Sequence, residues 1–445
     1  MKRVSRRPLT AIVVAAVVIG GWLVSPRLNA PADPVADAAP GQSARAGGDP
    51  TRSPVTAVEG SSSAPAVPTP SGAEGVPPGV VPSATLKLRA ALDARLESLR
   101  ATYGIPGISA AILFADGSIW RGTAGLADVA ARRPVTSDTE FSVASISKTF
   151  TAALILALAQ DGRLDLDSSA KTYVPALAID PAITIRELLD HTSGLRDFYF
   201  HPGIDKALLT QRARVWDTAR SMSYVRTSLA KPGVSWLYSN TNYLVLGIIA
   251  EAVGGAPVAR QLRDRFFTPL GLGDTYYQTA STPPGPVARG YRFTGSKLSL
   301  PAIDLFDGTQ IVPFTSVVTA AGAAGSIATN AGDLVRWARA LYGGDALDRA
   351  SRDAMLADIV RTAPYHPTVA YGLGVQAVQV DGRLTLGHSG RFLGSQAVVR
   401  WLPAEQIAIA VLTNQSRNDP AIVLADLLKL SLTPQSDCTA CPTIH

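Results

Sequence analysis

Hydrophobic and polar positions follow two different periods along the chain, and each period predicts a different kind of element. Leucines recur every three to four residues at positions 88, 92, 96 and 99, which predicts an amphipathic helix that Ser83 caps and that runs to about Ala101. Apolar runs at 108–114 and 118–123 then flank Ala115-Asp116-Gly117. Asp-Gly between two such runs is typical of a β-hairpin.

The rest of the chain divides into a helical middle and an extended C-terminal part. After Pro134 the helical period prevails to about Tyr342. From Gly372 alternation typical of strands takes over, and a last helix follows at about 420–432. The predicted strands are residues 373–380, 384–388, 395–402 and 406–413. We therefore expect an α/β fold of the α+β type, with an antiparallel sheet flanked by the terminal helices and an inserted helical lobe. A site is expected at the seam between sheet and lobe.

The N-terminal segment has the character of a membrane anchor. Residues 9–24 are sixteen residues without a charge, and four basic residues precede them. Basic residues before an apolar run keep that end in the cytoplasm and send the following chain across the membrane. We favour an uncleaved single-pass anchor within residues 1–29, with the chain that follows it outside the cytoplasm. The alternative is a cleaved signal peptide and a secreted protein, with Leu28-Asn29-Ala30 as a weak cleavage site.

Residues 30–82 consist mostly of Ala, Pro, Gly, Ser and Val and show no hydrophobic period. Such a segment buries too little apolar area to offset its ordering entropy, so we interpret it as a disordered linker. The folded domain is expected at 83–435, followed by a polar tail at 436–445. Cys438 and Cys441 lie in that tail. We interpret these two cysteines as a small disulfide loop, as a redox motif or as part of a tail without function, and the sequence leaves all three open.

Composition and charge indicate whether the protein binds nucleic acid, a metal ion or a cofactor. The net charge is +6, from 41 Lys and Arg against 35 Asp and Glu, and no dense basic stripe occurs, so no nucleic-acid partner is predicted. None of the five histidines lies four residues from another, so neither a metal site nor a cofactor is predicted. A composition that is 47% hydrophobic and 17% charged is compatible with a well-packed globular enzyme.

The first candidate for chemistry is Ser145 with Lys148, directly before the apolar helical run that starts at Ala152. Residues three apart on a helix lie on one face, so the ammonium can reach the hydroxyl. Burial would lower the pKa of the lysine and let it accept the serine proton. Alone, Ser-x-x-Lys also fits a surface helix cap.

Two further motifs follow in the chain. Tyr238-Ser239-Asn240 offers a phenol that could ionise next to a lysine and an amide that could hold both the lysine and a substrate carbonyl. His388-Ser389-Gly390-Arg391 ends a predicted strand, where the missing side chain of Gly390 would let a ligand backbone approach and the strand edge could pair with an extended substrate. A buried tyrosine and a glycine-rich hairpin are the structural alternatives.

In this order the three motifs resemble the penicillin-recognising serine hydrolases, specifically the branch of class C β-lactamases, D-alanyl-D-alanine carboxypeptidases and related esterases. The resemblance runs from about Leu88 to Leu432. It includes the stretches 188–195, 269–275 and 412–414, which resemble packing motifs of that family. It implies a β-lactamase/transpeptidase-like fold.

The resemblance also implies roles. Ser145 would be the acylated nucleophile, Lys148 and Tyr238 would share general-acid and general-base duty, and Asn240 would orient the substrate. Backbone N–H groups of Ser145 and Arg391 would bind the oxyanion.

The third motif departs from the Lys-Thr-Gly pattern of the wider family. His388 would replace its lysine, and Ser389 would keep a hydroxyl for a substrate carboxylate. The side chain of Arg391 could add a positive charge there, although a surface role is equally compatible. His191 is interpreted as structural.

The predicted function is an extracytoplasmic serine hydrolase of the D-Ala-D-Ala carboxypeptidase or esterase type, acting on a peptidoglycan-like peptide or an ester. A class C-like β-lactamase and a catalytically inactive peptidoglycan- or protein-binding domain remain alternatives. We expect the membrane to be contacted through the N-terminal segment. The sequence predicts neither the physiological substrate nor an oligomeric state.

Overall fold

The computed structural model describes residues 85–293, 302–357, 359–362 and 369–433, and its framework is one antiparallel sheet. The strand order is β3-β2-β1-β14-β13-β12-β11-β10-β9, so the first and last parts of the chain meet at its centre. The strands are β1 Gly107–Leu113, β2 Ile119–Asp128, β3 Arg133–Pro134, β9 Val360–Arg361, β10 Val369–Tyr371, β11 Gln376–Val380, β12 Arg383–Phe392, β13 Ser395–Leu402 and β14 Ile407–Thr413.

The predicted hairpin is present as β1 and β2. Leu113 pairs with Ile119 across a turn in which Gly117 has a φ of 84°, a left-handed value that glycine adopts without strain. On its other side β1 pairs with β14, from Ile108 opposite Thr413 onward. Every residue of β1 and β14 is buried, because helices cover both faces of the sheet there.

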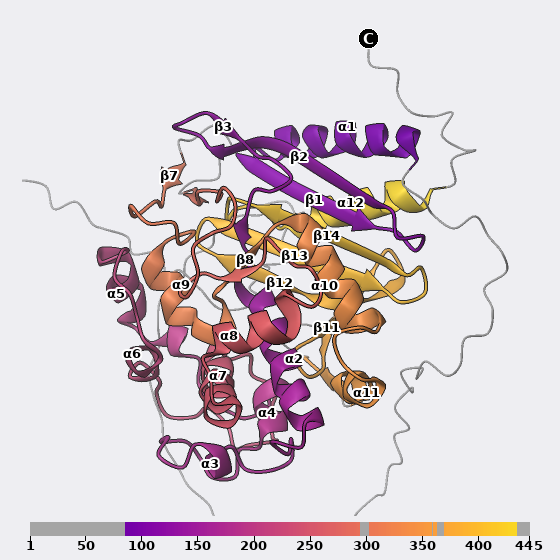
Figure 1. Ribbon diagram of the computed structural model, residues 1–445. Coiled ribbons are helices and arrows are strands. Elements are labelled where there is room, and N and C mark those ends of the chain that lie inside the picture. The colour runs from indigo at the N-terminus through magenta and orange to yellow at the C-terminus, as the bar shows by residue number, and fades with distance from the viewer. Residues whose placement is uncertain (1–84, 294–301, 358, 363–368, 434–445) are drawn as a thin grey trace, which may run out of the picture. The chain divides into compact units, whose positions relative to one another are not determined.

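The two terminal helices, α1 (Leu86–Thr102) and α12 (Pro420–Leu432), pack together on one face of the sheet (Figure 1). The four predicted leucines of α1 are buried, and the cap that the structure describes is Thr85, whose hydroxyl accepts from the N–H of Leu88. Arg95 of α1 forms two hydrogen bonds with Asp426 of α12, both 2.6 Å long. This layer confirms the expected terminal helices.

The opposite face carries α10 (Ala331–Gly343), which packs on β14, β1 and β13 (Figure 1). Behind it lies α2 (Ser147–Gln160), in which nearly every residue is buried. The ring of Phe150 stacks on that of Trp337, with centroids 4.0 Å apart. The other helices are α3 Ala170–Tyr173, α4 Ile185–Leu189, α5 Ile204–Thr210, α6 Thr218–Met222, α7 Asn240–Gly254, α8 Val258–Leu262, α9 Thr315–Ala321 and α11 Arg349–Ala357, with short turns η1 Ala144–Ile146, η2 Phe198–Phe200, η3 Arg263–Phe267 and η4 Gly322–Ala324.

The middle of the chain is rich in helices, as predicted, and it also contains short strands that the sequence did not indicate. A small sheet joins β4 (Phe141–Ser142), β8 (Ile327–Thr329) and β5 (Tyr276–Tyr277), and another joins β6 (Tyr291–Arg292) and β7 (Ile303–Asp304). Strands of two or three residues are too short to produce a recognisable period.

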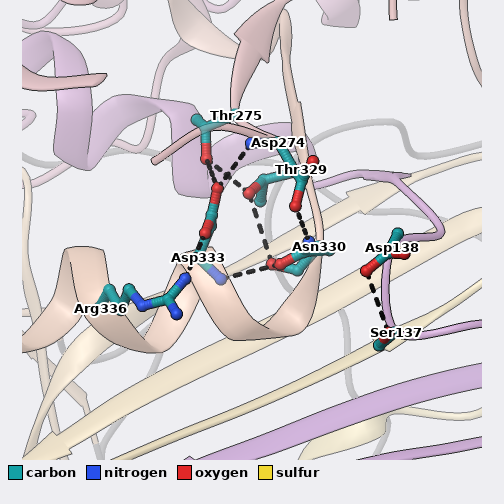
Figure 2. A network of polar contacts seen from close by, with 8 residues as sticks. All are labelled: Ser137, Asp138, Asp274, Thr275, Thr329, Asn330, Asp333 and Arg336. Atoms are coloured by element: carbon teal, nitrogen blue, oxygen red, sulfur yellow. Dashed lines mark hydrogen bonds and ion pairs between the residues drawn. The ribbon is translucent and has the colours of Figure 1, made fainter. Parts of the chain in front are cut away.

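A polar network ties the stretch 269–275 to the start of α10 (Figure 2). The carboxylate of Asp333 accepts from the backbone N–H of Asp274 at 2.8 Å and from Thr275, and it also pairs with Arg336. Asn330 caps the helix by accepting from the N–H of Asp333 and donates to Asp274 at 2.6 Å. The stretch thus packs as a structural motif that holds α10 beside β8.

In the described part of the chain, no single helix combines the length and apolar character that a bilayer crossing requires. Residues 240–254 and 258–267 meet that criterion only as a pair, bent by 75°. The predicted anchor (1–29), linker (30–82) and tail (436–445) lie outside the described residues.

Candidate active site

Ser145 lies in the one-turn η1, between strand β4 and helix α2. Ala144 before it has a φ of 45°, a left-handed value that costs a non-glycine residue about 1–2 kcal/mol. The turn is held from both sides, since the N–H of Val143 donates to Ile327 and the hydroxyl of Ser147 accepts from the N–H of Ile327. The half-buried Ser145 side chain is therefore presented by a rigid turn.

The side chain of Lys148 is fully buried one helical turn after Ser145. Its Nζ donates to Ser145 Oγ at 3.0 Å, to Asn240 Oδ1 at 2.7 Å and to the carbonyl of Ala324 at 2.9 Å. An ammonium has three hydrogens, so these acceptors satisfy it completely.

Burial lowers the pKa of Lys148 to about 7, while the charge of Asp197 acts in the opposite direction. The amine is therefore neutral in a large fraction of molecules near pH 7. A neutral amine 3.0 Å from Ser145 Oγ can accept the hydroxyl proton.

Tyr238 is hydrogen-bonded to the same hydroxyl of Ser145. The Nζ of Lys148 is 5.1 Å from the centre of its ring. Burial raises the pKa of Tyr238, a hydrogen bond with Ser145 lowers it, and the charge of Asp197 raises it, with a net upward shift. The expectation of an easily ionised phenol was therefore wrong in direction. Desolvation outweighs the nearby amine, and Tyr238 rests as a protonated donor.

Asn240 begins α7, where its side chain lies between two charged groups. Its Oδ1 accepts from Lys148, and its Nδ2 donates to Asp197 Oδ2 at 2.7 Å. Asp197 is 3% exposed and was not singled out from the sequence. Its signal was a lone carboxylate between Leu195 and the aromatic run 198–200.

The third motif lies inside β12 rather than at its end, which corrects the predicted strand boundary. Strand β11 pairs with β12 only as far as Gln376 opposite Gly387. Within the described residues, the backbone from His388 to Phe392 pairs only with β13. The other edge of this segment has no strand partner among the described residues, and an extended ligand could pair with it.

Gly390 lets β12 approach the nucleophile turn. A Cβ atom at this position would overlap the carbonyl oxygen of Val143 and would lie 3.1 Å from the backbone nitrogen of Ser145. The close approach expected at Gly390 is thus made by the chain's own backbone. It brings the start of the Arg391 peptide next to Ser145.

His388 is fully buried and points toward the same side as Gly390. Its Nδ1 lies 2.6 Å from the carbonyl oxygen of Ser389, which can only accept, so Nδ1 carries the hydrogen. Nε2 then accepts from the hydroxyl of Tyr371 at 3.0 Å. Burial and the charge of Lys148 lower the pKa of His388 to about 3. The residue in place of the family lysine is therefore uncharged.

Ser389 points to the opposite face of the sheet from His388 and meets a buried cation. Its hydroxyl donates to Gln376 Oε1 at 3.3 Å, and the same oxygen accepts from Arg400 at 3.0 Å. Arg400 is 4% exposed, and burial lowers its pKa to about 10, so it stays charged. The Arg391 side chain is exposed and donates to the carbonyl of Ser416.

Comparison with known proteins agrees with this arrangement. A family model described as Beta-lactamase matches residues 92–433. The chain belongs to the beta-lactamase family. The resemblance, the fold class and the assignment to the serine hydrolases are thereby confirmed.

Relatives of this beta-lactamase family member include penicillin-binding proteins. It is 30% identical to penicillin-binding protein 4 of Amycolatopsis lactamdurans over 72% of this chain and 84% of that protein. It is 27% identical to penicillin-binding protein 4* of Bacillus subtilis over 65% of each. The chain thus spans less than two thirds of the Bacillus protein.

Among solved structures, a D-stereospecific amidohydrolase from Streptomyces sp. superimposes with a TM-score of 0.66 at 29% identity. The match covers 77% of this chain and 98% of that one. The beta-lactamase domain described above is therefore present in nearly complete form in that neighbour.

The structure brings Ser145, Lys148, Tyr238 and Asn240 together and sets Gly390 against them. The remaining predicted site residues, His388, Ser389 and Arg391, lie on the adjacent strand with their side chains bonded elsewhere.

His191 has the structural position expected of it. Its buried ring is 4.3 Å from that of Tyr238, and its Nδ1 accepts from the N–H of Ser239. It therefore supports the segment that carries Tyr238.

Proposed function

We propose that this member of the beta-lactamase family hydrolyses D-amino-acid peptide bonds through an acyl-enzyme on Ser145, with preference for a substrate that ends in a free carboxylate. The observation that carries the proposal is the fully buried amine of Lys148, 3.0 Å from Ser145 Oγ, with its pKa lowered to about 7. A base with that pKa, in contact with the nucleophile, suits acyl transfer near neutral pH.

Acylation begins when Ser145 Oγ bonds to the scissile carbonyl carbon and its proton passes to the neutral amine of Lys148. The developing oxyanion accepts from the N–H groups of Ser145 and Arg391, which the packing of Gly390 draws together. Tyr238 gives its proton to the leaving nitrogen as the C–N bond breaks, and the ammonium of Lys148 returns a proton to the phenolate. The high pKa of Tyr238 suits this acid role.

In deacylation Lys148 again acts first as a base and then as an acid. A water molecule attacks the ester carbon while its proton passes to Lys148, and the ammonium then protonates the departing oxygen of Ser145. The products are a carboxylic acid and the free serine, so no further reactant is needed.

The preference for a substrate with a terminal carboxylate is proposed from the charges around Ser389. Arg400 is buried beside it, and Arg391 is two residues away on the same face of β12. The buried carboxylate of Asp197, on the Lys148 side of the site, is already bonded to Asn240 and to the N–H of Tyr199. This balance favours a substrate carboxylate over an ammonium group.

A second candidate is an amidase that acts on D-amino acid amides. The specific observation in its favour is the near-complete match to the D-stereospecific amidohydrolase. Such substrates carry an ammonium group instead of a terminal carboxylate, so the two candidates predict opposite charge preferences.

The deciding experiment compares kcat/KM for an Nα-acetylated peptide ending in D-Ala-D-Ala, the same peptide with an amidated C-terminus, D-phenylalanine amide, a p-nitrophenyl ester and nitrocefin. We expect the free acid to exceed its amidated form by about tenfold, the effect of one charge-assisted contact. Fastest turnover of D-phenylalanine amide would favour the amidase. Cleavage of the ester alone would favour an esterase, and rapid nitrocefin turnover a β-lactamase. No labelling by a fluorophosphonate would favour a binding domain.

We further propose an extracytoplasmic location, with residues 9–24 as the anchor and residues 30–82 as the spacer. The supporting observation is the uncharged run behind four basic residues. An alkaline phosphatase fusion after residue 82 should be active in cells, and recovery of the domain in the culture medium would instead favour signal cleavage. An inactive, cell-associated fusion would contradict both.

A further inference from the structure

Asp197 is a buried acid with no counter-ion in direct contact among the described residues. It caps η2, where its Oδ1 accepts from the N–H of Tyr199 at 3.0 Å. Its Oδ2 accepts from Asn240 Nδ2 at 2.7 Å. Burial of this 3% exposed carboxyl raises its pKa, while the hydrogen bonds from Tyr199 and Asn240 and the charge of Lys148 lower it, so its anionic form depends on these partners. The nearby cation is Lys148, on the far side of the Asn240 amide.

The hydrogen-bonding capacities of these groups leave one orientation for the amide. A carboxylate only accepts, so the NH₂ group of Asn240 must face Asp197. An ammonium only donates, so the Oδ1 of Asn240 must face Lys148. If the amide were flipped, its NH₂ group would face the ammonium of Lys148 and its oxygen would face the carboxylate of Asp197, so neither hydrogen bond could form. The acid and the amine therefore fix Asn240 from opposite sides.

The other groups around Lys148 bring no negative charge. Its Nζ faces the hydroxyl of Ser145, the carbonyl of Ala324 and the rings of Tyr238 and Tyr243. The two nearby imidazoles, His191 and His388, are buried with lowered pKa values and are uncharged. Within the described residues, Asp197 is thus the acid that balances the charge of Lys148.

We infer that Asp197 is a positioning residue for acylation: through Asn240 it fixes the acceptor that holds Lys148 beside Ser145, and it supplies the negative charge opposite that amine. This inference rests on the proposed function of Ser145 and Lys148. Asp197 does not contact the reacting atoms. Its effect should therefore be visible both in the acylation rate and in the pH at which acylation begins.

The sign of the pH effect follows from the charge. Acylation requires neutral Lys148, so its rate rises as the pH passes through the pKa of that lysine. Asp197 raises this pKa. Removing the carboxylate charge should move the acid limb of the profile to lower pH, although the same change also disturbs the hold on the amine.

The test measures the second-order rate of Ser145 labelling by a fluorophosphonate from pH 5 to 9, together with Tm, in the full chain. For Asp197→Asn we expect about 10²-fold slower labelling at pH 7, since a displacement of about 1 Å can cost that much. We also expect a lower midpoint of the acid limb. The matched control is Asp190→Asn, another buried aspartate, whose carboxylate accepts from Thr192 instead. It should change Tm without moving the midpoint.

The exchange variant Asp197→Asn with Asn240→Asp provides the second arm. In this variant the amide at position 197 can again donate to an acceptor at position 240. The carboxylate, however, now lies directly against Lys148. We expect faster labelling than in Asp197→Asn and a midpoint above that of the wild type. The inference is overturned if Asp197→Asn retains the wild-type rate and midpoint. If Asp197→Asn does not fold, a wild-type midpoint in the exchange variant overturns it. Absence of labelling in the wild type would instead refute the proposed function.

Discussion

The two walls of the site balance their charges differently. On the wall formed by η1, α2 and α7, the cation Lys148 is bonded to three acceptors and faces a buried acid through an amide. On the β12 wall, the cation Arg400 lies on the face of the sheet opposite to Gly390, is bonded to Gln376 and a backbone carbonyl, and forms no ion pair with a carboxylate within the described residues. Burial lowers the pKa of Lys148 to about 7, so this amine can give up and regain a proton, whereas Arg400, with a pKa of about 10, stays charged and can attract an anion. The proposed function therefore places the chemistry on the first wall and substrate selection on the second.

Removal of the amine is the strongest way to break the first wall. Lys148→Ala leaves Ser145 without its base and Asn240 without its donor. We expect labelling and peptide turnover to fall by at least about 10³-fold, because general-base catalysis and positioning are lost together. Rates should be compared across the pH range, since the wild type should lose activity as the pH falls below about 7, where Lys148 becomes protonated.

Lys148→Arg is the matched variant, because it keeps a cation but cannot become neutral near pH 7. It should be as inactive as Lys148→Ala. Wild-type rates in either variant, with an intact fold by circular dichroism, would remove Lys148 from the mechanism.

Gly390 joins the two walls, so a methyl group there tests whether they must touch. In Gly390→Ala the new Cβ would overlap the carbonyl of Val143, and β12 must shift away from Ser145. We expect a loss of about 10²–10³-fold in kcat, the usual effect of losing one oxyanion donor. Gly273→Ala is the control, since a Cβ at that position meets nothing within 4 Å. Equal activity of both variants would show that the approach of β12 is unimportant for catalysis.

The sequence predicted more of the contacts in the first wall than in the second. Ser145 and Lys148 are three positions apart, so local helical geometry already brings them together. Their link to Asp197 runs through an amide 43 positions further along the chain, and only the tertiary fold creates it. The direction of the Tyr238 pKa was also missed, because burial that no local pattern encodes outweighs the neighbouring amine.

The same limit explains the errors in the fold. The long strands β13 and β14 and the helix α12 gave clear periods and were predicted almost to the residue. Strands β4 and β8, which carry the chain into the nucleophile turn, have two and three residues and exist through pairing alone. The neutrality of His388 likewise follows from its burial and its contact with Tyr371.

Arg400→Gln tests the second wall by removing its buried cation. We expect KM for the free-acid peptide to rise about tenfold, as for one lost charge-assisted contact, while turnover of a p-nitrophenyl ester stays unchanged. Arg400→Lys keeps the charge and should keep most of the preference for the acid. If Arg400→Gln lowered the turnover of the peptide and of the ester equally, Arg400 would stabilise the fold and would not select the substrate.

The smallest effect is expected far from both walls, at the pair between α1 and α12. Arg95 and Asp426 form two parallel hydrogen bonds, but their side chains are 45% and 32% exposed. Water screens such a pair, so a double-mutant cycle with Arg95→Ala and Asp426→Ala should give a coupling of about 0.5–1 kcal/mol in the free energy of unfolding. Labelling of Ser145 should remain at the wild-type rate. A coupling far above that range would show that the layer of terminal helices depends on this ion pair. It would also weaken the contrast drawn here, in which only buried charges have large consequences.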